Sequence, residues 1–223
     1  IHSFIHSFIH SFIHSFIHWI NNLFLEDFMK YCRFLAIVLT AATLALTACS
    51  DDGGDNGGTT PVIYAIGDTG PSGVGIVFYV TDGGLHGLEV APVDQSTSAA
   101  WSTITGTLIG TTGTAIGTGS DNTDDIITQN TGAASAAKIC RDYRAAQEGD
   151  WFLPSRDELN AIWVNLVDDG SGANSGVGGF ATAVYWSSSE NGASNAWAQL
   201  FNGGDQGDAN KNSPSRVRAV RAF

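Results

Sequence analysis

The side chains best suited to bind a ligand lie between the last two strand-like runs of the chain. The segment Asn202–Ser215 has one apolar residue besides glycine and proline, Ala209. Its amides and carboxylates can exchange hydrogen bonds with a hydroxyl-rich ligand, and loops carried by a rigid sheet often hold binding residues. A bare solvated turn is the simpler interpretation of the same stretch. With their neighbours, the candidate ligand-binding residues are Trp186, Glu190, Asn191, Ser194, Asn195, Trp197, Gln199, Asn202, Asp205, Gln206, Asp208, Asn210, Lys211, Asn212 and Ser213.

Aromatic and basic residues beside this segment have two interpretations each. Trp186 or Trp197 could offer an apolar face to a sugar ring, although burial in the core is the simpler expectation for both. The arginines of the last strand are expected to form ion pairs inside the fold rather than to bind a ligand. These arginines are Arg216, Arg218 and Arg221, and the expected partners are Asp150, Asp157 or Glu158.

Catalytic chemistry has little support in the sequence. Ser187–Ser189 could supply a nucleophile, but His86 is the only histidine after residue 48 and no Gly-x-Ser-x-Gly motif occurs. Asp157 and Glu158 are adjacent on a predicted helix and point in different directions, so they do not form a facing acid pair. We therefore expect no enzyme, with a hydrolase as the least favoured alternative.

Two predicted helices must help to position these residues. Ser155 and Glu158 have the spacing of a capping box, and apolar residues then recur every three or four positions from Leu159 to Val167. The other helix, Ala133–Ala146, places Cys140 on its apolar side. A lone cysteine there is more often a small buried hydrophobe than a nucleophile.

Strand-like runs flank the helices on both sides, and the last three of them are expected to form an antiparallel meander. Strands, two helices and then a meander is the order of an α+β domain. The acidic run Asp121–Asp125 is interpreted as a helix cap before Ile126. The predicted strands are Gly75–Val80, Leu88–Pro92, Val184–Ser189, Ala196–Phe201 and Arg216–Phe223.

The N-terminal part of the chain is expected to lie outside the folded domain. Residues 1–16 are four copies of Ile-His-Ser-Phe, the peptide encoded by a repeated ATTC tetranucleotide. We interpret residues 1–28 as translated upstream DNA and Met29 as the start, with a His-rich metal site as the alternative. Residues 29–48 have the basic start and short apolar stretch of a signal peptide.

A lipid anchor is expected at Cys49. The stretch Leu46–Cys49, Leu-Thr-Ala-Cys, resembles the lipobox of bacterial lipoproteins, which implies cleavage before Cys49 and acylation, for example by palmitate, for stable membrane attachment. Residues 49–60 then form a flexible tether, and residues 61–223 a single domain. The Ser-Asp-Asp after Cys49 resembles a surface-export signal of some Bacteroidetes lipoproteins, although a plain spacer explains it equally well.

The charge balance excludes one class of partner. The chain has 22 acidic and 10 basic residues and a formal net charge of −12. No Lys or Arg occurs between Ser50 and Ala137, whereas binding of nucleic-acid phosphates requires a basic face. We therefore expect no nucleic-acid partner.

Several blocks of sequence resemble a known bacterial family when they are taken in order. They are Gly73–Tyr79, Gly84–Glu89, Asp150–Leu159, Val184–Glu190, Asn195–Trp197 and Arg216–Arg221. The chain resembles the family of the C-terminal domain of the Legionella collagen-like adhesin. The resemblance implies a surface domain of lipoproteins and adhesins with a C-type-lectin-like fold, and the adhesin itself is reported to bind sulfated glycans.

The resemblance sets the expected function. We expect a lipid-anchored protein of the outer membrane, exposed at the cell surface, that binds an extracellular glycan or protein through its C-terminal loops. A structural envelope lipoprotein without a ligand is the alternative. The acid-proline-asparagine motif of calcium lectins is absent, so no metal or other cofactor is expected. The same fold type carries variable proteins of diversity-generating retroelements, and the composition of residues 191–215 resembles their diversified surfaces.

Overall fold

The computed structural model describes residues 60–145, 148–168 and 176–223. The predicted translated repeat (1–28), signal peptide (29–48) and Cys49 with its tether (to residue 59) lie outside these ranges. Thr60–Phe223 form one unit by their internal contacts. In the part of the chain that is described, no helix combines the length and apolar character needed to cross a membrane.

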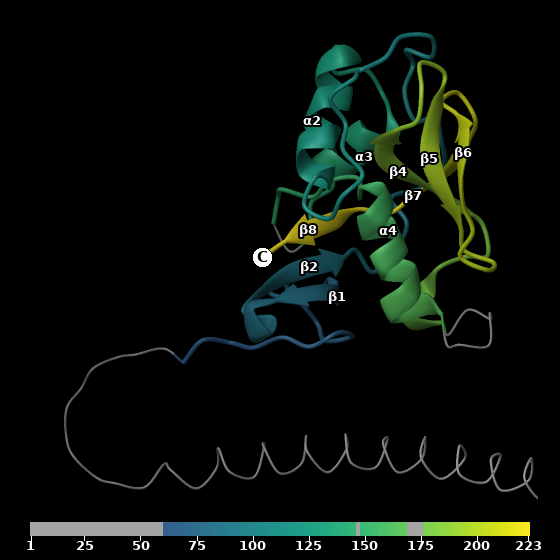
Figure 1. Ribbon diagram of the computed structural model, residues 1–223. Helices are drawn as coiled ribbons and strands as arrows, with labels where there is room; N and C mark the ends of the chain where they lie inside the picture. Colours follow the sequence, from purple (N-terminus) through teal and green to yellow (C-terminus); the bar gives the residue numbers. More distant parts are fainter. Residues whose placement is uncertain (1–59, 146–147, 169–175) are drawn as a thin grey trace, which may run out of the picture. The chain divides into compact units, whose positions relative to one another are not determined.

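A three-stranded antiparallel sheet joins the two ends of this unit (Figure 1). β1 (Ile76–Thr81) and β2 (His86–Val90) form a hairpin through the short 3-10 turn η1 (Asp82–Gly84). The last strand, β8 (Val220–Ala222), pairs with β2, with Leu88 opposite Ala222. The end of the chain therefore closes on its first hairpin.

A five-stranded sheet carries most of the predicted ligand-binding residues. Its order is β3–β7–β4–β5–β6, and β4, β5 and β6 form an antiparallel meander. The third strand of this meander is β6, whereas the prediction assigned that place to Arg216–Phe223. The strands are β3 (Ser96–Ala99), β4 (Val184–Glu190), β5 (Asn195–Leu200), β6 (Gln206–Asn210) and β7 (Ser215–Val217).

One predicted strand and one predicted loop in the last part of the chain were wrong. The run Arg216–Phe223 is divided between β7, which pairs parallel to β4, and β8 in the other sheet. The division falls at Arg218, whose guanidinium turns inward to Asp94 at 2.7 Å. The polar segment 202–215 is also not one loop, because β6 lies inside it and pairs with β5. Its residues have low strand propensity, so the pairing with β5 must hold them in a strand.

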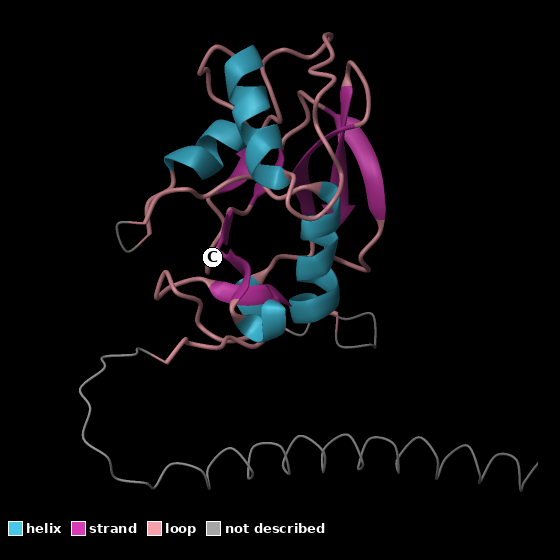
Figure 2. Cartoon of the chain, turned by 60° about the vertical axis from the view of Figure 1, so that its left-hand side comes forward, coloured by secondary structure: helices cyan, strands magenta, loops and turns pink. Residues whose placement is uncertain are grey.

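The helices differ from the prediction mainly in number. They are α2 (Gly119–Gln129), α3 (Ala136–Asp142) and α4 (Arg156–Ile162); α4 continues into a π-helical turn, η2 (Trp163–Val167), and a 3-10 turn, η3 (Val177–Gly179), follows. Figure 2 shows these helices beside the strands. The α+β class is confirmed by three helices and two sheets in the described residues.

The interpretation of Asp121–Asp125 as a helix cap was wrong, because these residues lie within α2. Their low helix propensity is offset by contacts with the rest of the fold. Asn122 donates to the carbonyl oxygen of Gly113 at 2.8 Å, and Thr123 accepts from the backbone N–H of Leu153 at 3.0 Å. The predicted helix 133–146 is present but shorter, beginning after the cap Ser135.

The capping box of α4 is confirmed. The Ser155 hydroxyl accepts from the backbone N–H of Glu158 at 3.2 Å, and the Glu158 carboxylate accepts from that of Ser155 at 2.7 Å. Glu158 is fully buried and also accepts from Gly117 at 2.8 Å. Burial raises the pKa of its carboxyl group, and these hydrogen bonds oppose the rise.

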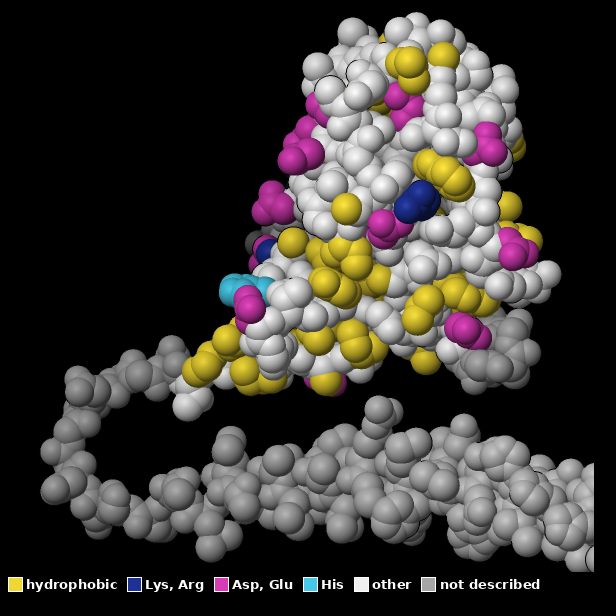
Figure 3. Space-filling model, viewed as in Figure 1, with side chains coloured by type: hydrophobic (Ala, Val, Ile, Leu, Met, Phe, Trp, Pro, Cys, Tyr) yellow, Lys and Arg dark blue, Asp and Glu magenta, His cyan; other side chains and the backbone are white. Residues whose placement is uncertain are grey.

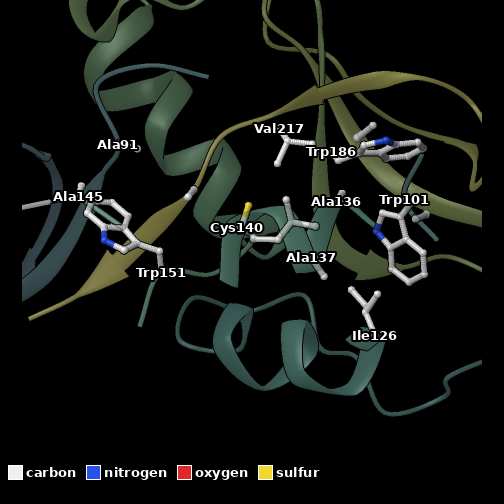
Figure 4. Packing of buried hydrophobic residues seen from close by; sticks show 14 residues of the cluster. Ala91, Trp101, Ile126, Ala136, Ala137, Cys140, Ala145, Trp151, Trp186 and Val217 are labelled. Atoms are coloured by element: carbon white, nitrogen blue, oxygen red, sulfur yellow. The ribbon is translucent and has the colours of Figure 1, made fainter. Parts of the chain in front are cut away.

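Neighbouring residues of β4 point into two separate parts of the core. Trp186 belongs to the same buried cluster as Trp101, Ile126 and Cys140 and lies beside Trp101 in Figure 4. Tyr185 belongs to the other cluster, which contains Leu159 and Ile162 of α4. The five-stranded sheet is therefore covered by α2 and α3 on one face and by α4 on the other. Cys140 is a free, buried thiol, as predicted.

Candidate functional site

Most of the predicted ligand-binding residues lie on the protein surface. They come from β5 and β6 and from the β4–β5, β5–β6 and β6–β7 turns. The exposed members are Asn191, Ser194, Asn202, Asp205, Gln206, Asp208, Asn210 and Asn212, and the half-buried members are Asn195, Trp197 and Ser213.

The register of the β5–β6 hairpin puts several of these side chains on one face. Trp197 lies opposite Asp208, and Asn195 lies opposite Asn210. Directly paired residues point to the same side of an antiparallel sheet, so these four share a face with Gln206. The Asn195 amide donates to the Asp208 carboxylate at 2.5 Å. We call these five residues the hairpin face.

The positively charged side chain of Arg156 lies beside the hairpin face. The Arg156 guanidinium lies over the Trp197 ring, with its carbon 5.1 Å from the ring centroid, and pairs with Asp157 at 2.9 Å. The Gln206 amide donates to the Arg156 carbonyl oxygen at 2.9 Å. Arg156 was missed in the sequence because its position over Trp197 depends on how α4 packs against β5.

Two candidate residues belong to the core. Trp186 is fully buried, and its indole N–H donates to the Ala99 carbonyl oxygen at 2.9 Å. Gln199 is also fully buried and donates to Asn160 at 3.0 Å and to the Gly204 carbonyl oxygen at 2.9 Å. The sheet interior and α4 cover these two side chains, so they are not part of the exposed surface on which a ligand was predicted to bind.

Glu190 and Lys211 were also predicted to bind a ligand, but they form a buried ion pair. The Glu190 carboxylate also accepts from the backbone N–H groups of Ile109 and Gly110, each at 3.0 Å. The Lys211 ammonium donates to the Thr107 carbonyl oxygen at 3.3 Å. It also lies 4.8 Å from the centre of the Trp101 ring. A ligand could reach neither charge without opening these contacts.

This ion pair brings three loops to one end of the five-stranded sheet. Loop 107–113 is bound to Glu190 at the end of β4, and Lys211 begins the β6–β7 turn. The Lys211 backbone N–H also donates to the carbonyl oxygen of Ser194 in the β4–β5 turn at 2.8 Å. The three loops lie together at the top of Figure 1. We call them the loop end; they expose Leu108, Asn191, Ser194 and Asn212.

A shallow groove lies on the lower part of the β4–β6 meander. Its volume is about 230 Å³, and it is lined by Val184, Ala198, Leu200 and Ala209 together with Asp205 and Gln206. Val184, Ala198 and Leu200 point to the side opposite Trp197, because paired residues share a face and successive residues alternate. The hairpin therefore combines polar side chains with a small apolar depression.

The groups considered for catalysis are not brought together. Ser187–Ser189 are fully buried in β4, and their hydroxyls bond to the Trp197 carbonyl, the Asn122 amide and the Gly113 carbonyl, respectively. His86 is exposed in the other sheet. Within the described ranges, no group of three or more His, Cys, Asp or Glu side chains is placed to hold a metal ion.

Internal ion pairing of the terminal arginines is confirmed, with other partners than expected. Arg216 and Arg218 both pair with Asp94, at 2.6 and 2.7 Å. Arg221 pairs with Glu89 and Glu148, each at 3.0 Å. The last strands are thus fastened to segments near β2 and after α3, which leaves the hairpin face at the open edge of the sheet.

Comparison with known families places this surface within a recognised region. Residues 92–221 match the family model described as Lcl C-terminal domain. The match covers more than half of the chain and includes the hairpin face and the loop end. No curated protein matches the chain.

Proposed function

Because the chain belongs to the Lcl C-terminal domain family, we propose that it is a surface lipoprotein that binds an extracellular glycan or protein through its hairpin face and loop end. The proposal includes acylation of Cys49, attachment to the outer membrane and exposure at the cell surface. The family resemblance and the lipobox-like sequence Leu46–Cys49 support these parts.

One observation carries the binding proposal. The most polar stretch of the chain is built as an exposed edge strand with exposed turns, and the buried Lys211–Glu190 pair fixes the neighbouring loops. A mere connector between β5 and β7 would not need such anchoring. Rigid support reduces the entropy that a binding surface loses when it captures a ligand.

The charges of this surface favour an uncharged or cationic ligand. Asp205 and Asp208 are exposed, whereas Lys211 is buried and Arg156 is already paired. The face drawn in Figure 3 shows few basic side chains among scattered acidic ones. Amides with an aromatic edge suit the hydroxyls and apolar patches of neutral sugars. For this chain we therefore favour a neutral glycan over the sulfated glycans suggested by the resemblance.

We also propose that the α+β fold is C-type-lectin-like. The pairing of β8 with β2, which closes the unit at its two ends, supports this assignment. The separation of Ser187–Ser189 from His86 supports binding rather than hydrolysis.

The function is tested by screening the mature protein against glycan arrays and immobilised host glycoproteins. The variant carries Asn195→Ala, Trp197→Ala and Asp208→Ala on the hairpin face. A matched control carries Lys138→Ala and Asp142→Ala, an exposed pair on α3. We expect binding by the wild type and the control and loss in the variant. An empty screen, together with an envelope defect in a deletion strain, would favour the structural alternative.

A further inference from the structure

The described unit has an exposed apolar surface where the chain enters it. Val62, Ile63, Ile66 and Leu85 are 40–63% exposed. Figure 3 shows hydrophobic side chains gathered at the lower left, where the described residues begin. Exposed apolar clusters of this kind mark contact with another protein or with a membrane. We call these four residues the basal patch.

The basal patch is fixed to the fold rather than carried on a free end. The Tyr64 backbone N–H donates to the Gly84 carbonyl oxygen at 2.9 Å, and the Tyr64 ring meets Phe223 edge-on at 5.1 Å. Gly84 has φ of +96°, and a Cβ there would lie 2.3 Å from the Tyr64 carbonyl oxygen. This close approach places Ile63 beside the β1–β2 turn that carries Leu85.

The charges around the basal patch do not suit an anionic partner. Asp68 and Asp82 are exposed nearby, and the chain has no Lys or Arg between Ser50 and Ala137. Asp68 accepts from the backbone N–H of Ala65 at 2.8 Å. Attraction to this surface must therefore come from its apolar side chains.

The proposed lipid anchor supplies an apolar partner close by. Thr60 follows Cys49 by eleven residues, and a chain of that length reaches at most about 40 Å. A short tether holds two surfaces at an effective concentration on the order of millimolar, so even a weakly apolar surface is held close to the bilayer. We propose that the basal patch docks on the outer lipid surface. This proposal rests on the lipid anchor proposed for Cys49.

This docking would orient the domain. The loop end lies at the top of Figure 1, away from the β1–β2 hairpin that carries Leu85. With the basal patch on lipid, the loop end points away from the membrane and toward an extracellular ligand.

The test uses the lipidated mature protein in phosphatidylcholine vesicles that contain a doxyl-labelled quencher lipid. An NBD fluorophore is attached at His86→Cys beside the basal patch or at Asn212→Cys at the loop end. Cys140 is buried and Cys49 carries the lipid, so the introduced thiol is labelled. We expect strong quenching at position 86, little at position 212, and no increase with anionic lipid.

Substitution of the basal patch distinguishes docking from simple tethering. Ile63→Ser with Leu85→Ser should remove the excess quenching at position 86, whereas Leu108→Ser, an equally exposed apolar control at the loop end, should not. Equal quenching at both positions while the protein floats with the vesicles would overturn the docking proposal alone. Self-quenching of the fluorophore that disappears on dilution would also overturn the docking proposal, because it would show that the basal patch contacts a second copy of the protein. Failure to float would overturn the lipid anchor and, with it, the docking.

Discussion

Lys211→Met tests the conclusion that this lysine is an internal anchor rather than a ligand-binding residue. The Lys211 side chain is 0% exposed and that of Glu190 is 4% exposed. The substitution leaves the Glu190 carboxylate buried with two backbone donors and no countercharge. Removing one partner of a buried ion pair costs about 3–5 kcal/mol, which lowers a urea midpoint by roughly 1–3 M for a domain of this size.

The control and the double variant make this prediction specific. Lys138→Met removes an exposed i,i+4 pair with Asp142, for which about 0.5 kcal/mol or less is expected. Combining Lys211→Met with Glu190→Gln also removes the unpaired buried charge of Glu190 and should restore part of the lost stability. Urea unfolding, followed by tryptophan fluorescence, measures the free energy of unfolding of Lys211→Met, of Lys138→Met and of the double variant. If Lys211→Met costs no more than Lys138→Met, the buried anchor is refuted.

Three further outcomes follow from the core and the turns. Burial raises the pKa of the Cys140 thiol far above its usual range, so Ellman's reagent should react with it only after urea unfolding. Because burial raises the pKa of Glu158, its ionisation costs stability as pH rises from the ordinary glutamate range through the folded-state pKa. Glu158→Gln should therefore gain stability relative to wild type over that interval, as urea midpoints between pH 4 and pH 8 will show. Gly84→Ala should cost more than about 1 kcal/mol by strain at positive φ and collision with Tyr64, measured by thermal unfolding.

Local sequence signals predicted the features that depend on neighbouring residues. The capping box of Ser155 and Glu158, the apolar stripe of α4 and the burial of Cys140 all follow from spacing along the chain. The α+β order followed from the sequence of strand-like and helical runs. These features need no knowledge of which distant segments meet.

The features that escaped prediction depend on distant contacts. β6 is a strand because it pairs with β5, although Gly207, Asp208 and Asn210 disfavour strands in isolation. Lys211 and Glu190 were expected at the surface because charged residues usually lie there. Only the fold shows that they meet, with loop 107–113 supplying backbone groups to both. The place of Arg156 over Trp197 likewise depends on the packing of α4.

Selective blocking of the hairpin face tests directly whether the ligand binds there. A polyethylene-glycol maleimide is attached to Asp208→Cys on the hairpin face or to Lys138→Cys on α3, and binding to the ligand from the screen is compared before and after modification. Modification at position 208 is expected to abolish binding, whereas modification at position 138 is expected to leave binding unchanged. Full binding by the protein modified at position 208 would show that the hairpin face does not bind the ligand.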